Sequence, residues 1–124
     1  MSKVRHIEFA GPDADSLRSF YGRLFGWAAS GRDVGGYQYF DLEMPGGLTA
    51  GIRQEPQGVG EIVAYVDVED LATSVQQAQA LGAKIRIPPK IVGAIRFALV
   101  EDPAGNPIGL TEELKDRHAG KVQT

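Results

Sequence analysis

The stretch Val4-Arg5-His6-Ile7-Glu8-Phe9-Ala10, together with a second stretch that repeats it, Glu61-Ile62-Val63-Ala64-Tyr65-Val66-Asp67, decides the fold. Apolar and polar residues alternate in the first stretch, with His6 and Glu8 on one side, which predicts a strand with one face in a core. Each stretch is followed by an acidic turn and by an amphipathic segment that ends at a glycine. His6 and Glu61 therefore occupy matching positions in two copies of one unit.

The composition indicates one soluble, globular domain over residues 1–124. The chain is 43% hydrophobic and 23% charged, which is ordinary for a folded protein, and its length suits a single core. The net charge of −3 and the scattered Lys and Arg residues predict no nucleic-acid partner. No apolar run is long enough to span a membrane, and the absence of cysteine excludes disulfides and thiolate ligands. A cytoplasmic location is the expectation.

Hydrophobic spacing predicts two similar modules. Module one covers residues 4–54, a glycine-rich linker covers 55–60, module two covers 61–112, and a polar tail covers 113–124. Helical spacing predicts helices over 14–25 and over 71–81, with Gly26 and Gly82 as their C-terminal caps. The predicted strands are 4–10, a piece that begins at 27–29, 37–42, 48–53, 61–67, 84–87 (stopped by Pro88-Pro89), 95–100 and 107–111. The first helix is expected to pack its aromatic and leucine side chains on the sheet: Phe20, Tyr21, Leu24, Phe25 and, just beyond it, Trp27.

Matching residues in the two modules indicate an internal duplication. His6 matches Glu61 at an offset of 55 residues, and the offset grows to 58 for Gly51 and Gly109. A Pro-x-Gly turn precedes each of these last two glycines at the same spacing. Small changes in loop length between related units explain the growing offset. The repeated unit has the order β-α-β-β-β, and one copy alone could not bury its sheet face.

Several motifs resemble those of the vicinal oxygen chelate superfamily, which contains glyoxalase I, bleomycin-resistance proteins and extradiol dioxygenases. They are most similar to the small bacterial glyoxalase-like proteins. The resemblance covers residues 4–112 and implies an α+β fold in which two tandem βαβββ modules form a curved, eight-stranded, cup-like sheet. It also implies a homodimer. The motifs are His6, Phe20-Tyr21, Leu24-Phe25-Gly26-Trp27, Tyr65-Val66-Asp67-Val68-Glu69-Asp70-Leu71, Leu81-Gly82-Ala83, and Asp102-Pro103-Ala104-Gly105-Asn106-Pro107-Ile108-Gly109-Leu110.

The superfamily's enzymes hold a divalent metal, and the resemblance implies the positions of its ligands here. These positions are His6, Gly51, Glu61 and Gly109, so that two of the four have no side chain. Catalytic zinc generally takes three protein ligands, and octahedral metals take three or four. The chain is therefore expected to have an incomplete metal site and no cofactor, with a divalent metal on His6 and Glu61 as the alternative. The other histidine, His118, lies in the polar tail.

Four residues are predicted to contact a ligand: His6, Glu8, Glu61 and Tyr65. His6 is either a hydrogen-bonded structural residue or a base, donor or ligand, and Glu61 is either a solvated charge or its acid–base partner. Glu8 lies about 7 Å along the strand from His6, which suits a substrate contact better than a shared metal. Tyr65 either packs in the wall or offers its hydroxyl. Weaker candidates of the same kind are Tyr37, Tyr39 and Arg53.

These observations leave three interpretations of the function. In the first, the chain binds a small apolar or aromatic molecule beside an incomplete metal site, as drug-sequestering relatives do. In the second, it is a metal-dependent enzyme, a glyoxalase I-type lyase, an isomerase or an extradiol-type dioxygenase, that uses His6 and Glu61. In the third, it is a non-catalytic dimeric interaction module. The two glycines at expected ligand positions favour the first interpretation over the second.

Overall fold

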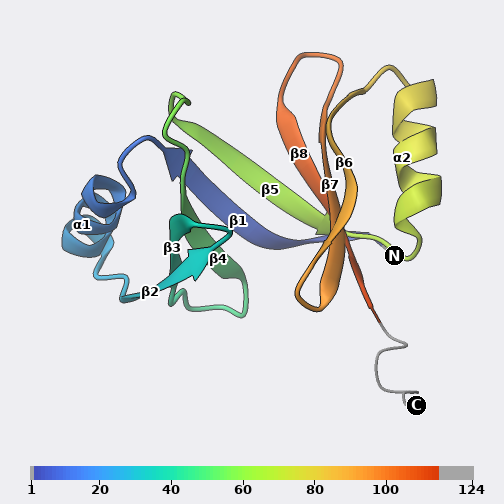
Figure 1. Cartoon of the computed structure of the whole chain (residues 1–124). Helices are drawn as coiled ribbons and strands as arrows, with labels where there is room; N and C mark the ends of the chain where they lie inside the picture. Colours follow the sequence, from blue (N-terminus) through green and yellow to red (C-terminus); the bar gives the residue numbers. More distant parts are fainter. Residues whose placement is uncertain (1, 115–124) are drawn as a thin grey trace. The chain divides into compact units, whose positions relative to one another are not determined.

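The computed structural model describes residues 2–114 and shows an α+β fold built from two βαβββ modules (Figure 1). The predicted fold class and order of elements are confirmed. The first module contains β1 (Lys3–Gly11), α1 (Ala14–Phe25), β2 (Ala29–Val34), β3 (Tyr37–Leu42) and β4 (Thr49–Gln54). The second contains β5 (Glu61–Asp67), α2 (Leu71–Ala80), β6 (Lys84–Val92), β7 (Ile95–Glu101) and β8 (Pro107–Glu113). Strand β8 includes Glu113, which is the first residue of the predicted polar tail. Residues 115–124 of that tail, with His118, lie outside the described residues.

The hydrogen-bonded strand order is β2-β3-β4-β1-β5-β8-β7-β6, so the first strands of the two modules are neighbours. Strand β1 runs parallel to β4, whereas β3 is antiparallel to both β2 and β4, and β7 is antiparallel to β6 and β8. The chain divides into two compact units, residues 4–65 and residues 66–114 with residues 2 and 3. No helix within residues 2–114 has the length and apolarity needed to cross a bilayer.

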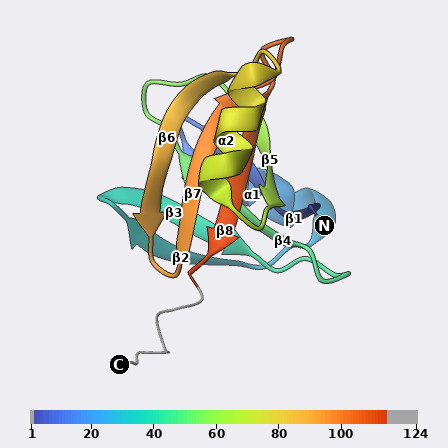
Figure 2. The same cartoon turned by 90° about the vertical axis from the view of Figure 1, so that its right-hand side faces the viewer.

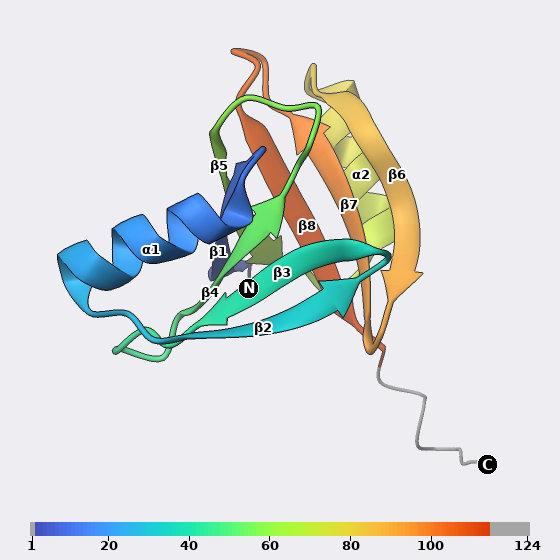
Figure 3. The same cartoon turned by 60° about the vertical axis from the view of Figure 1, so that its left-hand side comes forward.

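Capping residues set both ends of α1. The Asp13 carboxylate accepts a hydrogen bond from the Ser16 amide at 3.2 Å, which satisfies one of the free donors of the first turn. Gly26 takes the left-handed conformation with φ of 76°, and its amide donates to the Gly22 carbonyl at 2.8 Å. The helix therefore has the predicted bounds, and it lies against β3 and β4 (Figure 3).

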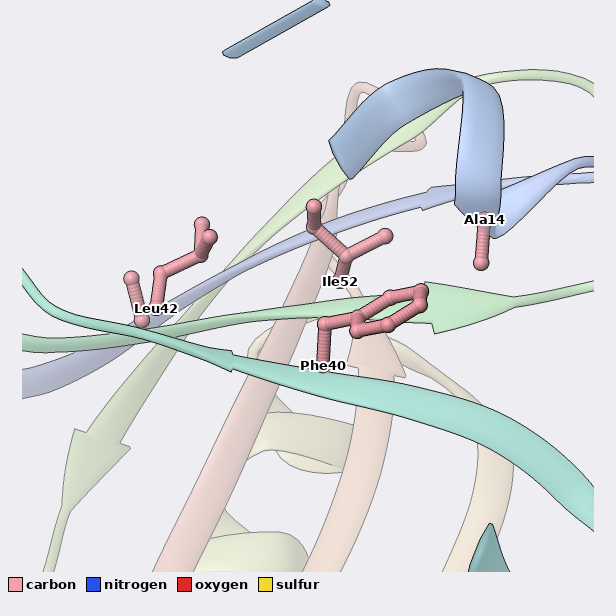
Figure 4. Packing of buried hydrophobic residues seen from close by; sticks show 5 residues of the cluster. Ala14, Phe40, Leu42 and Ile52 are labelled. Atoms are coloured by element: carbon pink, nitrogen blue, oxygen red, sulfur yellow. The ribbon is translucent and has the colours of Figure 1, made fainter. Parts of the chain in front are cut away.

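The core of this unit lies between α1 and one face of β3 and β4 (Figure 4). Phe40 and Leu42 alternate with Tyr39 and Asp41 along β3, so only the first pair points toward the helix. The same alternation places Gly51 on the opposite face of β4. The buried cluster consists of Ala14, Phe40, Leu42, Ala50 and Ile52, with Phe9, Leu17, Tyr21, Trp27, Ala29 and Met44 packed around it. The polar residues of β1, β3 and β4 therefore share the face that α1 leaves uncovered.

One prediction about α1 is wrong. Tyr21 and Trp27 pack against the core as expected, but Phe20 is 56% exposed, Leu24 is 58% exposed and Phe25 is 54% exposed. A helix advances by 100° per residue, so Phe20 and Leu24 point away from the stripe that faces the sheet. Because both stripes are apolar, the periodicity could not show that only one of them meets the sheet.

The second unit repeats this arrangement, with α2 lying on β6, β7 and β8 (Figure 2). The Asp70 carboxylate accepts a hydrogen bond from the Thr73 amide at 3.1 Å and so caps α2. Leu71 and Val75 from the helix form the buried cluster with Ala98 of β7. The helix ends at Ala80, one residue earlier than predicted.

The prediction that Pro88-Pro89 stops a strand is wrong. Strand β6 continues from Lys84 through both prolines to Val92. Its pairing with β7 shifts register on either side of Ile87, which accommodates two residues without an amide hydrogen. The strand order places β6 at the edge of the sheet, where a missing donor leaves no neighbour unsatisfied.

Candidate functional site

The candidate site lies on the face of β1, β3, β4 and β5 that is opposite α1. Strand register brings its residues together, because Glu8 on β1 is paired with Gly51 on β4, and Tyr39 on β3 is paired with Arg53 on β4. Tyr65 comes from β5 and hydrogen-bonds to Glu8. All of these residues belong to the unit of residues 4–65.

Both ring nitrogens of His6 are engaged in hydrogen bonds. Its Nδ1 lies 2.6 Å from Thr49 Oγ1, and its Nε2 lies 2.9 Å from the Tyr39 hydroxyl. Because the Thr49 hydroxyl donates to the Arg5 carbonyl at 3.2 Å, it accepts from His6, so Nδ1 carries the proton. Nε2 is then an acceptor for the Tyr39 hydroxyl. Burial lowers the pKa of His6, against an opposite effect of Glu8, and this favours the neutral ring that the hydrogen bonds require.

Tyr39 lies directly over Gly51. A Cβ atom added at Gly51 would come within 2.1 Å of the Tyr39 hydroxyl oxygen and within 2.6 Å of the ring. Any side chain at position 51 would therefore displace a buried tyrosine. Burial, and then the negative charge of Glu8, raise the pKa of Tyr39 well above its usual value, so the hydroxyl remains a proton donor. The space that the resemblance assigns to a metal ligand holds this phenol.

Glu8 is the buried charge of the site, with an exposed fraction of 5%. Its Oε1 accepts hydrogen bonds from Arg53 Nε at 2.9 Å and from the Tyr65 hydroxyl at 3.1 Å. The pKa of Tyr65 is raised by burial and by the charge of Glu8. A buried carboxylate is tolerated when it is paired and hydrogen-bonded, and these two donors meet that requirement.

Arg53 links Glu8 to two further carboxylates. Its Nη1 donates to Glu55, and its Nη2 lies 3.4 Å from Glu61 Oε2. Burial alone would lower the pKa of Arg53, but the hydrogen bond to Glu8 raises it, so the guanidinium stays charged. Three carboxylates therefore share one guanidinium at the junction of β1, β4 and β5.

The structure brings the predicted ligand-contacting residues together in two ways. His6, Glu8 and Tyr65 are direct neighbours, and the rings of His6 and Tyr65 meet edge to face at 5.8 Å. Glu61 joins them through Arg53.

The central position of Tyr39 could be anticipated only from Gly51, because a glycine inside a strand signals close approach of another group. Tyr37 is 54% exposed. Gly109 lies on β8, in the other unit.

The residues around His6 do not fit a three-ligand metal site. Within residues 2–114, no group of three or more histidine, aspartate or glutamate side chains is placed to hold a metal ion. Tyr39 covers position 51, and both nitrogens of His6 already have partners. A metal on His6 would require one of these hydrogen bonds to break.

Residues 6–111 match the model of the family described as the Glyoxalase-like domain. The chain belongs to this family. Methylmalonyl-CoA epimerase, a member of the vicinal oxygen chelate superfamily, is among its structural neighbours, which supports the resemblance noted in the sequence. No curated protein sequence matches this one.

Three solved structures illustrate the similarity of fold. A hypothetical protein from Bacillus halodurans C-125 has a TM-score of 0.70 and 15% identity, over 90% of this chain and 94% of its own. Methylmalonyl-CoA epimerase from Mycobacterium tuberculosis has a TM-score of 0.69 and 17% identity, over 94% and 91%. A variant of the Streptomyces coelicolor epimerase in complex with 2-nitronate-propionyl-CoA has a TM-score of 0.65 and 13% identity, over 90% and 96%. At such identities the similarity shows the fold.

Proposed function

We propose that this glyoxalase-like protein binds a small apolar or aromatic molecule beside His6 and Tyr65, without a catalytic divalent metal. The observation that carries the proposal is the placement of Tyr39. Its ring lies over Gly51 and its hydroxyl meets His6 Nε2 at 2.9 Å, so the nitrogen that could face a metal has a protein donor instead. The phenol at the position where the resemblance implies a metal ligand supports this proposal.

The character of the residues supports an aromatic ligand. The edge-to-face pair of His6 and Tyr65 offers a π surface against which a further ring can stack or pack edge-on. The nearby polar atoms of Glu8, Arg53 and Tyr39 are largely satisfied by one another. A ligand with few polar groups would therefore leave these hydrogen bonds intact, whereas a strongly polar ligand would have to replace them.

Metal content tests the first part of the proposal. Protein purified without chelators is expected to hold less than stoichiometric zinc, nickel, manganese and iron by mass spectrometry. His6→Ala and Glu61→Ala serve as controls, because they remove the two side chains that could ligate a metal. Stoichiometric metal in the unmodified protein that is lost in both variants would overturn the proposal.

Ligand binding tests the second part. Titration with small phenols and benzamides, followed by NMR, is expected to shift the ring signals of His6 and Tyr65. Tyr65→Ala should weaken binding by about 1 kcal/mol, a roughly fivefold loss, because one aromatic contact is removed. Tyr37→Ala is the matched control, since Tyr37 is exposed on the β2–β3 hairpin. Equal effects of the two variants would contradict the assigned site.

The hydrogen bonds favour one second function, an acid–base isomerase. Thr49, His6 and Tyr39 form a continuous chain of hydrogen bonds, and Glu8 lies next to Tyr39, where its charge raises the pKa of that phenol. Groups connected in this way can move a proton between a buried carboxylate and a neutral imidazole. The fold is shared with methylmalonyl-CoA epimerases, so methylmalonyl-CoA is a suitable probe. Deuterium uptake from heavy water that is lost in Glu8→Gln would support this function, and no uptake would exclude it for that substrate.

A further inference from the structure

A guanidinium lies over the ring of Tyr39, the tyrosine that donates to His6. It belongs to Arg32 on the edge strand β2, which is antiparallel to β3 (Figure 3) and pairs Arg32 directly with Tyr39. The guanidinium carbon lies 4.9 Å from the centroid of the ring. A cation over an aromatic face at this distance is attracted by the electron-rich ring. Tyr39 is therefore held by a side chain from the β2 side, whereas on the β4 side it lies over Gly51, which has none.

Asp41 fixes the guanidinium in this position. Arg32 Nε donates to Asp41 Oδ2 at 2.6 Å, and Arg32 Nη2 donates to Asp41 Oδ1 at 3.2 Å. Asp41 lies two residues along β3 from Tyr39 and so shares its face of the sheet. Two parallel hydrogen bonds set the plane of a guanidinium as well as its place, which a single ammonium group cannot do. Both side chains are about half exposed, so the pair supplies geometry more than stability.

The second module has the same cation and ring without the carboxylate. Lys90 and Phe97 are register partners there, and the ammonium nitrogen lies 5.9 Å from the ring centroid. They follow Arg32 and Tyr39 in the sequence by 58 residues. At the same offset, the position of the aspartate is taken by the buried, apolar Leu99. The carboxylate that orients the cation thus accompanies the ring that has a hydroxyl to aim, and Phe97 has no hydroxyl.

The hydroxyl of Tyr39 has to be aimed accurately. Strand β4 lies between β3 and β1, so the side chain reaches across β4 to meet His6 Nε2 at 2.9 Å. Hydrogen bonds weaken steeply when the donor shifts or tilts. The ion pair is also within electrostatic range of the imidazole: burial is the main cause of the lowered pKa of His6, and Arg32 adds to it whereas Asp41 opposes it. A movement of the Arg32 side chain would therefore be felt at His6.

We infer that Arg32 is a positioning residue of the site, which keeps the Tyr39 hydroxyl on His6 Nε2. Asp41 supports it by fixing the guanidinium over the ring. The consequence for ligand binding rests on the proposed function. Once Arg32 is lost, the ring of Tyr39 is free to leave His6 and to compete with a ligand for the surface formed by His6 and Tyr65.

The nitrogen signals of the His6 ring test the positioning without any ligand. They are observed by NMR at about pH 8, where a ring with a lowered pKa is neutral. In Arg32→Gln the Nε2 signal should move in the same direction as in Tyr39→Phe, whereas Nδ1 keeps its contact with Thr49. Lys90→Gln is the matched control, because it removes the cation over the corresponding ring of the second module. An unchanged Nε2 signal in Arg32→Gln, or an equal change in Lys90→Gln, would overturn the inference.

Two further variants separate positioning from a general structural effect. Arg32→Lys keeps a positive charge but not the two parallel hydrogen bonds, so its Nε2 signal should lie between those of the unmodified chain and Arg32→Gln. Adding Arg32→Gln to Tyr39→Phe should leave the signal where Tyr39→Phe alone places it, because the hydroxyl through which Arg32 acts is already absent. A further shift in the double variant would show that Arg32 acts on His6 by another route. Circular dichroism checks that all variants are folded.

A titration with phenol tests the consequence for binding. Arg32→Gln should weaken the binding of phenol by about two- to fivefold, the range expected for one exposed cation–π contact, and Lys90→Gln should not. An affinity in Arg32→Gln equal to that of the unmodified chain would overturn this consequence. The two possible failures are distinct. An unmodified chain that binds no phenol contradicts the proposed function, whereas an Nε2 signal that does not respond contradicts the role of Arg32.

Discussion

The two βαβββ modules share one scaffold and differ in the chemistry that they place on it. In both, an aspartate caps the helix, and a side chain from the module's last strand accepts a hydrogen bond from the first helical amide. Gln54 accepts from Ala14 at 3.3 Å in the first module, and Glu112 accepts from Leu71 at 3.0 Å in the second. These two acceptors are 58 residues apart, the offset of the matched strand glycines. The duplication has kept the contacts that join helix to sheet.

The site positions have not been kept. Tyr39 and Arg53 are a register pair in the first module, and the matching register pair in the second is Phe97 and Thr111. A cation lies over the ring in both, Arg32 at 4.9 Å from Tyr39 and Lys90 at 5.9 Å from Phe97. Glu8 is matched by the buried, apolar Val63. The scaffold forms with either set of residues, so the fold does not require the polar set of the first module.

The largest expected effect on stability comes from replacing one residue of the first module with its counterpart in the second module. Arg53→Thr copies Thr111 and removes a hydrogen-bonded cation from Glu8, whose side chain is only 7% exposed. A buried carboxylate without its partner should cost about 3 kcal/mol of unfolding free energy, measured by urea denaturation. Arg96→Thr is the control. Its pair with Glu112 is more exposed, with side chains 40% and 23% accessible, so it should cost less than about 1 kcal/mol.

Copying both residues should recover much of that loss. Glu8→Val with Arg53→Thr reproduces the Val63–Thr111 combination and removes the unpaired charge. Well-packed apolar residues often replace a buried ion pair without loss, although the Tyr65 hydroxyl would lose its acceptor, at about 1 kcal/mol. A double variant less stable than Arg53→Thr would show that the two modules do not tolerate the same residues.

Gly51→Ala should have the next largest effect. The new Cβ atom overlaps the buried phenol of Tyr39, and overpacking of this kind costs about 2 kcal/mol. If the overlap is the cause, the double variant Gly51→Ala with Tyr39→Ala should lose less free energy of unfolding than the sum of the losses in the two single variants. Additive losses in urea denaturation would mean that Tyr39 does not lie over Gly51.

Tyr39→Phe introduces the residue type of Phe97 and should lower the free energy of unfolding by about 1 kcal/mol. The reason is that His6 Nε2 loses its hydrogen-bond donor, whereas the aromatic ring at position 39 remains. The nitrogen signals of the His6 ring, observed by NMR, should shift at Nε2 more than at Nδ1, which keeps its contact with Thr49. An unchanged Nε2 signal would contradict the hydrogen bond.

The smallest effect concerns pH. Because burial lowers the pKa of folded His6 below its ordinary value of 6.5, the unfolded chain binds a proton more readily at this residue. Stability should therefore fall as the pH drops below about 6.5, and the loss should end below the folded pKa. Thermal unfolding at pH 7.5 and 5.5 measures it, and His6→Asn should reduce the difference. The second module has no histidine within the described residues, so the pH effect belongs to the first.

Much of the fold followed from local patterns, because alternation, helical spacing and caps act over a few residues. The helix over 14–25 and the strands over 37–42 and 61–67 have their predicted bounds. The sequence failed where the outcome depended on distant neighbours. Pro88-Pro89 lies within a strand because that strand is at the sheet edge, and Phe20 is exposed because the other stripe of its helix meets the core.

The candidate site shows the same division. The sequence by itself determined the duplicated scaffold, the chemical identity of His6 and Glu61, and the missing side chain at position 51. Only the tertiary structure decided what occupies that space, because Tyr39 comes from a neighbouring strand whose register no local pattern specifies. The pairing of β1 with β4 brings Glu8 close to Arg53 and His6 close to Thr49, and the pairing of β3 with β4 places Tyr39 as the second partner of the His6 ring.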